Sequence, residues 1–145
     1  MNKKIIISII FFIIIILLFV IGTRDTKKVL VCNGDVIVIG GQANQEYTFE
    51  GVNNFVKKEK LEVRLIVFDN SSMEEFIEIL KNNKDCTDLY ITDDFISYTC
   101  NYDLEKNHYY AELEDSKNRL PFDVIKEKME EDNFVCTYEY NYLFN

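Results

Sequence analysis

An apolar run near the N-terminus is the strongest pattern in the sequence. Residues 5–21 are apolar apart from one serine, two lysines precede them, and no charge follows before Arg24. As a helix rising about 1.5 Å per residue, the stretch 5–23 would reach about 28 Å, close to the ~30 Å hydrocarbon core of a bilayer. Apolar side chains on every face are typical of a membrane helix. We therefore predict a short tail at 1–4 and a transmembrane anchor at 5–22.

The same run also has features of a secretory signal peptide, which would be cleaved after Gly22. Two features favour an uncleaved, single-pass signal anchor. The run is longer than the usual apolar region of about 7–15 residues, and no A-x-A-like site follows it. A lipobox is also missing, since the first cysteine, Cys32, lies well beyond the run.

Beyond a short polar linker at 23–28, residues 29–145 are predicted to form one domain, long enough to bury a single core. Its first strand is predicted at 29–39, which is rich in Val and Ile and ends at Gly40-Gly41. Asn33-Gly34 inside this strand is itself a hairpin signal. It leaves open a tight turn or a bulge just after Cys32.

Two further strands are predicted at 46–52 and 55–68. Asn53-Asn54 between them suits a two-residue turn, because Asn tolerates left-handed backbone angles. In the third strand, apolar residues alternate with Glu62 and Arg64, which predicts one buried face. The apolar positions are Leu61, Val63, Leu65 and Val67.

The spacing becomes helical after this strand. Ser72 and Glu75 form a capping-box pattern, and apolar residues then recur at i, i+3, i+4 and i+7. A second helix is predicted from Pro121, because proline is tolerated at the first helical position. The predicted core faces are Met73, Phe76, Ile77 and Leu80 in the first helix, and Phe122, Ile125 and Met129 in the second.

The remaining segments predict an antiparallel sheet. Residues 89–91 and 95–102 read as a hairpin around Thr92-Asp93-Asp94, 103–118 as irregular with a helical turn, and 134–142 as a last strand. The order is βββαββ, then the irregular stretch, then αβ. Short connections in this order predict an α+β fold with both helices packed on one face of the sheet.

The four cysteines all lie in the predicted domain. Intervals of 53, 13 and 35 residues separate Cys32, Cys86, Cys100 and Cys136. These intervals fit neither the close pairs of a zinc site nor a C-x-x-C redox motif. An even number instead suits two disulfides in an oxidising compartment, which favours an extracytoplasmic domain at the cell membrane.

The predicted hairpin also indicates how the cysteines pair. If its turn centres on Asp93, Cys86 lies directly opposite Cys100, within bonding range. A two-residue turn at Asp93-Asp94 would instead set Thr87 opposite Cys100. We predict Cys86–Cys100, which leaves Cys32 and Cys136 to join the first strand to the last.

Charge and motifs exclude several function classes. After residue 22 the chain carries 14 basic and 25 acidic residues, a charge that repels nucleic acid and anionic lipid headgroups. The glycines form no nucleotide-binding pattern and the acidic residues form no calcium loop. His108, the only histidine, has no nucleophile motif beside it and is predicted to face solvent in a loop. We predict no catalytic residue, cofactor, metal or nucleotide.

Grouped carboxylates are the remaining catalytic candidates, because two such groups can divide acid and base roles as in glycosidases. The groups are Asp93-Asp94, Glu112/Glu114/Asp115 and Glu130-Glu131-Asp132. We interpret the first of these as a turn and the last as a solvated helix end.

Four short strand-like strings carry a resemblance to a known group of proteins. They are Leu30-Val31-Cys32, Glu46-Tyr47-Thr48-Phe49, 98–104 (YTCNYDL) and 134–138 (FVCTY). With them the chain resembles small lipid- or membrane-anchored envelope proteins of low-GC Gram-positive bacteria, related to the YehR-like lipoproteins. The resemblance implies an α+β envelope domain and supplies no catalytic residues, because that group has no established activity.

The function we expect is that of a membrane-anchored, extracytoplasmic, non-catalytic domain that binds a protein or an envelope component. All nine tyrosines lie outside the anchor, and tyrosine suits binding surfaces because it offers a large amphipathic contact at low entropy loss. Two alternatives stay open. One is a cell-wall glycan hydrolase that uses a carboxylate pair, and the other is an accessory subunit whose apolar helix pairs with another membrane protein.

Overall fold

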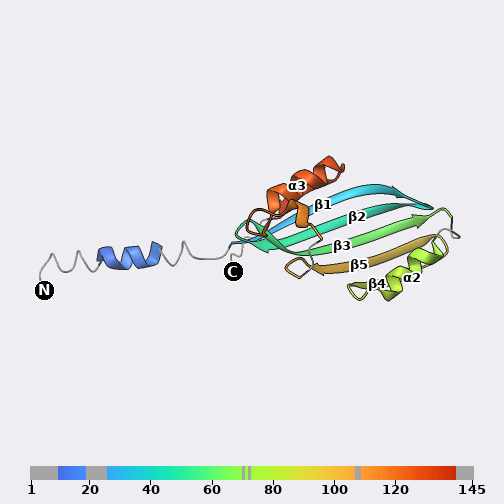
Figure 1. The fold of residues 1–145 in the computed structure, drawn as a ribbon, viewed down its shortest axis with the longest axis horizontal. Helices are drawn as coiled ribbons and strands as arrows, with labels where there is room; N and C mark the ends of the chain where they lie inside the picture. Colours follow the sequence, from blue (N-terminus) through green and yellow to red (C-terminus); the bar gives the residue numbers. More distant parts are fainter. Residues whose placement is uncertain (1–9, 19–25, 70, 72, 107–108, 140–145) are drawn as a thin grey trace, which may run out of the picture.

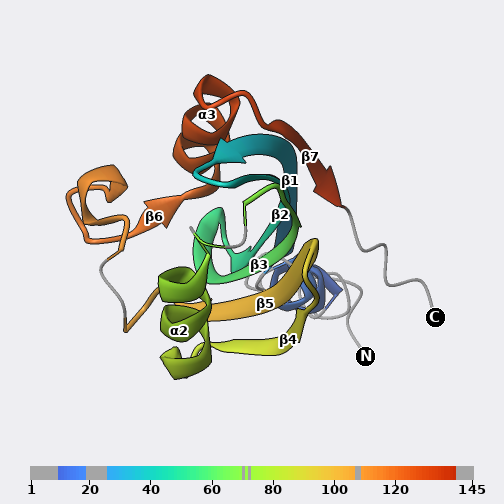
Figure 2. The same cartoon turned by 90° about the vertical axis from the view of Figure 1, so that its right-hand side faces the viewer.

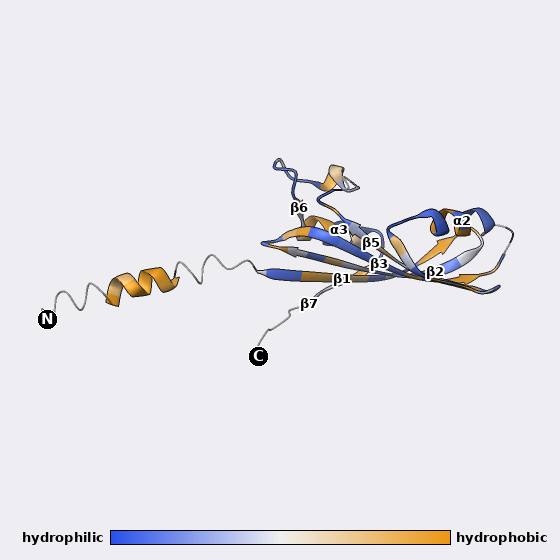
Figure 3. Ribbon diagram, turned by 90° about the horizontal axis from the view of Figure 1, so that it is seen from below, coloured by the Kyte–Doolittle hydropathy of each residue, from blue (hydrophilic) through white to orange (hydrophobic). Residues whose placement is uncertain are grey.

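The computed structural model describes residues 10–18, 26–69, 71, 73–106 and 109–139. Residues 10–18 are helical and apolar (Figure 3). The rest of the predicted anchor at 5–22 lies outside the described residues. Within the described part of the chain, no helix has the length and apolarity that a membrane span requires.

An antiparallel sheet dominates the rest of the structure (Figure 1). Its strands are β1 (Lys27–Val38), β2 (Gly41–Val52), β3 (Phe55–Val67), β4 (Cys86–Ile91), β5 (Phe95–Asp103), β6 (Leu120–Pro121) and β7 (Val135–Glu139). They are arranged in the order β4-β5-β3-β2-β1-β7, with β6 paired to β3. The helices are α2 (Glu74–Asn82) and α3 (Phe122–Glu131), and a 3-10 turn spans Ala111–Leu113. The predicted α+β fold is confirmed, and β6 is an addition to the predicted order.

β1 runs without a break through Asn33-Gly34, so this pair forms neither the turn nor the bulge that its sequence allows. Asn33 pairs with Glu46 and Gly34 with Gln45 in an unshifted register. The glycine serves packing instead, because an added Cβ would lie 2.6 Å from Cδ1 of Phe134. An aromatic ring therefore lies directly on the backbone of β1.

The two hairpin loops beside β2 are tight. Ile39 and Gly40 form the first, with Gly40 at φ 81°, so β2 begins at Gly41 and not at residue 46 as predicted. Asn53 and Asn54 form the second, with φ values of 51° and 67°, as their tolerance of left-handed angles predicts.

Both helices lie on the same face of the curved sheet, as predicted (Figures 2 and 3). α3 covers the end where Leu30 of β1 and Phe49 of β2 are buried. α2 covers the other end, over Leu65 of β3 and Ile96 of β5. One side of the sheet therefore carries two separate core clusters, one under each helix.

The predicted helix faces agree with the structure, whereas the predicted helix starts are each one residue off. Phe122, Ile125 and Met129 are buried in α3, and Met73 and Leu80 are buried at α2. Met73 occupies the N-cap of α2 without a side-chain cap hydrogen bond, and Ser72 lies outside the described residues. Pro121 is the N-cap of α3 and not its first residue, because its extended backbone also pairs with β3.

Disulfides join Cys86 to Cys100, as the hairpin geometry predicts, and Cys32 to Cys136, the pair that this leaves. Each disulfide fixes an edge strand, β7 or β4, to its inner neighbour. Both lie on one row of paired residues across the sheet. The row contains Cys136, Cys32, Tyr47, Leu61, Cys100 and Cys86.

The register that aligns Cys86 with Cys100 comes from an unpredicted bulge. Near the turn, Ile91 faces Ile96, which is the pairing of the two-residue Asp93-Asp94 turn. The register then shifts between Thr87 and Tyr90, where Asp88 adopts φ 54°. This shift brings Cys86 opposite Cys100, so the predicted pair is correct although the predicted turn is wrong.

Candidate functional site

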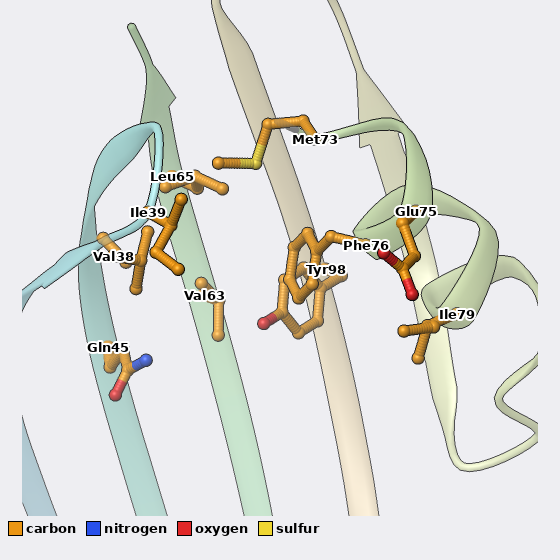
Figure 4. Close-up of a pocket in the computed structure, with 11 residues that line it drawn as sticks. Val38, Ile39, Gln45, Val63, Leu65, Met73, Glu75, Phe76, Ile79 and Tyr98 are labelled. Atoms are coloured by element: carbon orange, nitrogen blue, oxygen red, sulfur yellow. The ribbon is translucent and has the colours of Figure 1, made fainter. Parts of the chain in front are cut away.

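A groove opens on the helix-bearing face of the sheet, between α2 and the β1–β2 hairpin (Figure 4). Its volume is about 440 Å³. Its floor is formed by Ala43, Gln45, Val63, Leu65 and Tyr98 from three strands, and its walls by Val38, Ile39, Met73, Glu75, Phe76 and Ile79. A cavity of this size is typical of sites for small ligands.

The walls of the groove follow from two local features of the sequence. The tight turn at Gly40 brings Ile39 of the hairpin loop to one wall, where its side chain stays 86% exposed. The helical spacing of α2 brings Phe76 and Ile79 to the other wall. Phe76 packs edge-on against Tyr98 of β5, with the ring centroids 6.0 Å apart. α2 is thereby fixed over β5, and the groove lies between α2 and the β1–β2 hairpin.

Few polar groups enter this apolar space. Figure 4 shows the Tyr98 hydroxyl and the Gln45 amide directed into it from the floor, with Glu75 beside Ile79 on the α2 wall. Gln45 Oε1 accepts a hydrogen bond from the Tyr47 hydroxyl at 3.4 Å. Burial raises the pKa of Tyr98 to about 12, so its phenol stays neutral and able to donate a hydrogen bond.

A buried carboxyl group lies on the same sheet face, toward the α3 end. Glu59 of β3 is 4% exposed and faces Phe49 and Tyr102 on the neighbouring strands. The Tyr110 hydroxyl donates a hydrogen bond to it, whereas its Oε2 has no partner among the described residues. Burial raises the pKa of Glu59 to about 7, and the Tyr110 hydrogen bond opposes part of that rise.

The pKa values of the tyrosines around Glu59 are raised as well. Burial, and then the nearby Glu59 carboxylate, raise the pKa of Tyr47 to about 12 and raise that of Tyr110 further. The hydroxyl groups of Tyr47 and Tyr110 therefore stay protonated and neutral at physiological pH. This part of the sheet face combines apolar side chains with tyrosine hydroxyl donors and the buried carboxyl group of Glu59.

The carboxylate groups considered from the sequence lie apart from the groove. Asp93 and Asp94 occupy the exposed β4–β5 turn. Asp115 pairs with Arg119, whose Nη2 lies 2.6 Å from Oδ2, and this contact holds the pKa of Asp115 below its usual value. Glu130 pairs with Lys126 at the end of α3. The structure brings none of these three groups together.

Across the described ranges, no cluster of three or more His, Cys, Asp or Glu side chains is arranged to hold a metal ion. His108 lies outside the described residues.

The sequence reasoning missed the two features that define this face. Glu59 shares the parity of Leu61, Val63 and Leu65, so extending their alternation two residues back would have placed it on the buried face. The groove had no such signal, because it depends on where α2 comes to rest over the sheet.

Comparison with known proteins bears on the fold alone. No protein-family model and no curated protein matches the chain. Among solved structures, the NMR structure of the E. coli YehR protein is similar, with a TM-score of 0.51 and 15% identity over 84% of this chain and 98% of that one. A likeness at this identity shows a related α+β architecture, in line with the expected resemblance.

Proposed function

We propose that this chain is a membrane-anchored, extracytoplasmic, non-catalytic domain that binds an apolar part of an envelope component or protein. The observation that carries the proposal is the groove between α2 and the β1–β2 hairpin, whose two walls carry the exposed apolar residues Ile39 and Ile79. Apolar surface gathered in a concave site favours ligand burial.

The exposed side chains around the groove support a binding role. Ile39 and Ile79 are 86% and 58% exposed and line its two walls. Single exposed apolar residues are ordinary, but residues that face each other across one concavity indicate a surface that becomes covered. The neutral Tyr98 hydroxyl and the Gln45 amide add the few directional contacts typical of ligand sites.

The location in this proposal rests on two separate features. Two disulfides fix both edge strands, and such bonds persist in oxidising compartments. The apolar segment at 5–22 would hold the domain at the cell membrane.

Photolabelling of the full chain in phosphatidylcholine nanodiscs tests the binding role. We would use an uncharged decyl maltoside that carries a diazirine in its chain, and map the labelled tryptic peptides by mass spectrometry. Saturable labelling is expected on peptide 65–81, which contains the α2 wall and part of the floor. Labelling confined to the N-terminal segment would refute the groove as a binding site.

A variant pair makes this test specific. The double change Ile39→Ser and Ile79→Ser replaces apolar groups on both walls and should strongly reduce labelling of peptide 65–81. Ile37→Ser is the matched control, because Ile37 is 88% exposed and lies two residues from Ile39 but does not line the groove. Equal loss in the control and the double variant would contradict the proposal.

A further inference from the structure

The charge that lines the groove is negative. Among the residues that line it, Glu75 is the one charged side chain. An adjoining hollow along α2 is lined by Glu75, Glu78, Ile79, Asn82 and Asn83, which again include carboxylates and no basic residue. The whole chain carries a formal net charge of −9.

This distribution discriminates between ligands with the same apolar body. A charge attached to an aliphatic chain in the groove meets Glu75 at the α2 wall, whereas the opposite wall carries no charged side chain. A carboxylate or phosphate there meets like charge from Glu75 and from the field of the acidic domain. An ammonium group there is attracted by both.

Resting on the proposed binding role of the groove, we propose that its ligand is a small amphiphile with one aliphatic chain and a positively charged amine or ammonium group. The chain lies over the floor formed by β2, β3 and β5. The charge lies beside Glu75 at the exposed end of the α2 wall. The cavity volume of about 440 Å³ suits one such molecule.

A series of probes with one chain and three head groups tests this assignment. The full chain in phosphatidylcholine nanodiscs would be labelled with diazirine-bearing decyl probes ending in trimethylammonium, maltoside or carboxylate. Half-saturation of labelling on peptide 65–81 should occur first for the ammonium probe and last for the carboxylate. The difference between these two should be on the order of tenfold at low salt, because exposed charge pairs are individually weak.

Two further measurements, the effect of ionic strength and a matched pair of variants, show which charge causes the preference for the ammonium probe over the carboxylate probe. The difference should shrink as ionic strength rises, since exposed charges are screened. Glu75→Gln should reduce the preference for the ammonium probe while the maltoside probe still labels. Glu74→Gln removes the same charge from the neighbouring exposed residue, which does not line the groove, and should leave most of the preference intact.

The outcomes separate this inference from the function on which it rests. If no probe labels peptide 65–81, the groove is not a binding site and both proposals fail. If all three probes label it equally, or if the carboxylate probe labels best, the groove binds chains and the cationic ligand is refuted. If Glu74→Gln and Glu75→Gln reduce the preference equally, the general field of the domain and not a contact at Glu75 selects the ligand, and the assigned position is overturned.

Discussion

Each end of the helix-bearing sheet face is covered by one helix, but the two ends differ in how completely their apolar side chains are buried. At the α3 end, Phe49 and Phe122 are fully buried, and even the carboxyl group of Glu59 is enclosed. At the α2 end, Ile39 and Ile79 stay exposed beside an open groove. The closed end shows the packing that a stable core requires, and the open end shows apolar surface that folding alone does not use.

The two helices are attached to the sheet in similar ways but bury different numbers of side chains. α3 is held on both sides, because the Phe122 N–H donates to the Asn54 carbonyl oxygen at 3.1 Å and the chain after α3 returns as β7. The Cys32–Cys136 disulfide then fixes β7 to β1. α2 buries only Leu80 within its own span, whereas α3 buries three residues. The chain after α2 likewise returns as an edge strand, β4, which the Cys86–Cys100 disulfide fixes to β5. The two helices therefore differ in how many of their side chains are buried.

The largest expected effect comes from the disulfide of the closed end. Cys32 and Cys136 are 104 residues apart, so replacing both with Ala should lower the free energy of unfolding by about 4–5 kcal/mol in the chain-entropy model. The same change at Cys86 and Cys100, 14 residues apart, should lower it by about 3 kcal/mol. Urea denaturation followed by tyrosine fluorescence measures both values.

Non-reducing peptide mapping checks the premise of that comparison. Linked peptides should contain Cys32 with Cys136 and Cys86 with Cys100. A link between Cys32 and Cys86 would contradict the pairing. Four freely alkylated thiols in protein from the native host would contradict the extracytoplasmic location as well.

Truncation of an α3 side chain gives the next effect. Ile125 is buried against Leu30 and Phe122, so Ile125→Ala should destabilise the fold by about 2–5 kcal/mol through lost burial and the cavity left behind. Glu127→Ala, on the exposed side of the same helix, should change stability little. Equal, small shifts of the denaturation midpoint for the two variants would show that α3 does not pack as described.

Glu59 should make the closed end sensitive to pH. Below about pH 4.5 its carboxyl group is protonated in both the folded and unfolded states. As the pH rises toward about 7, the unfolded chain ionises first, because burial raises the pKa in the folded state. Stability should therefore fall over this range by about 3 kcal/mol in total and level off above it.

Glu59→Gln isolates this effect. The amide is neutral at every pH and can still accept the Tyr110 hydrogen bond, so the difference between wild type and variant should grow from pH 4.5 to 7 and then stay constant. Glu62→Gln, the same change on the opposite face of β3, is the control. A wild-type minus Glu59→Gln difference that does not vary with pH would show that Glu59 is solvated.

The sequence predicts which faces of the strands and helices are buried, at both ends of the sheet, for physical reasons. The buried positions of α3 follow from helical spacing, and the strand that carries Val63 and Leu65 follows from alternation, because both patterns record burial on one face. Such features depend on local geometry that the sequence encodes directly.

Features that depend on how elements meet could not be derived in this way. Asn33-Gly34 gives a strong local turn signal, but the ring of Phe134, about 100 residues away, requires a glycine in a continuous strand there. The bulge at Asp88 likewise lies between two registers, one set by the turn, where Ile91 faces Ile96, and one at the disulfide, where Cys86 faces Cys100. The groove reflects the resting position of α2, which helical spacing leaves undetermined.

The smallest expected effect is also the most informative about the open end. Ile39→Ser and Ile79→Ser should each change the free energy of unfolding by no more than about 0.5 kcal/mol, because both side chains already face water in the folded chain. Apolar groups that add nothing to folding and yet line one concavity are better explained by a ligand than by the core. A loss above about 1.5 kcal/mol for Ile79→Ser would mean that α2 closes over the sheet in solution, since only a buried isoleucine contributes that much. In that case the two ends would be equivalent cores, and the contrast from which the binding role is inferred would disappear.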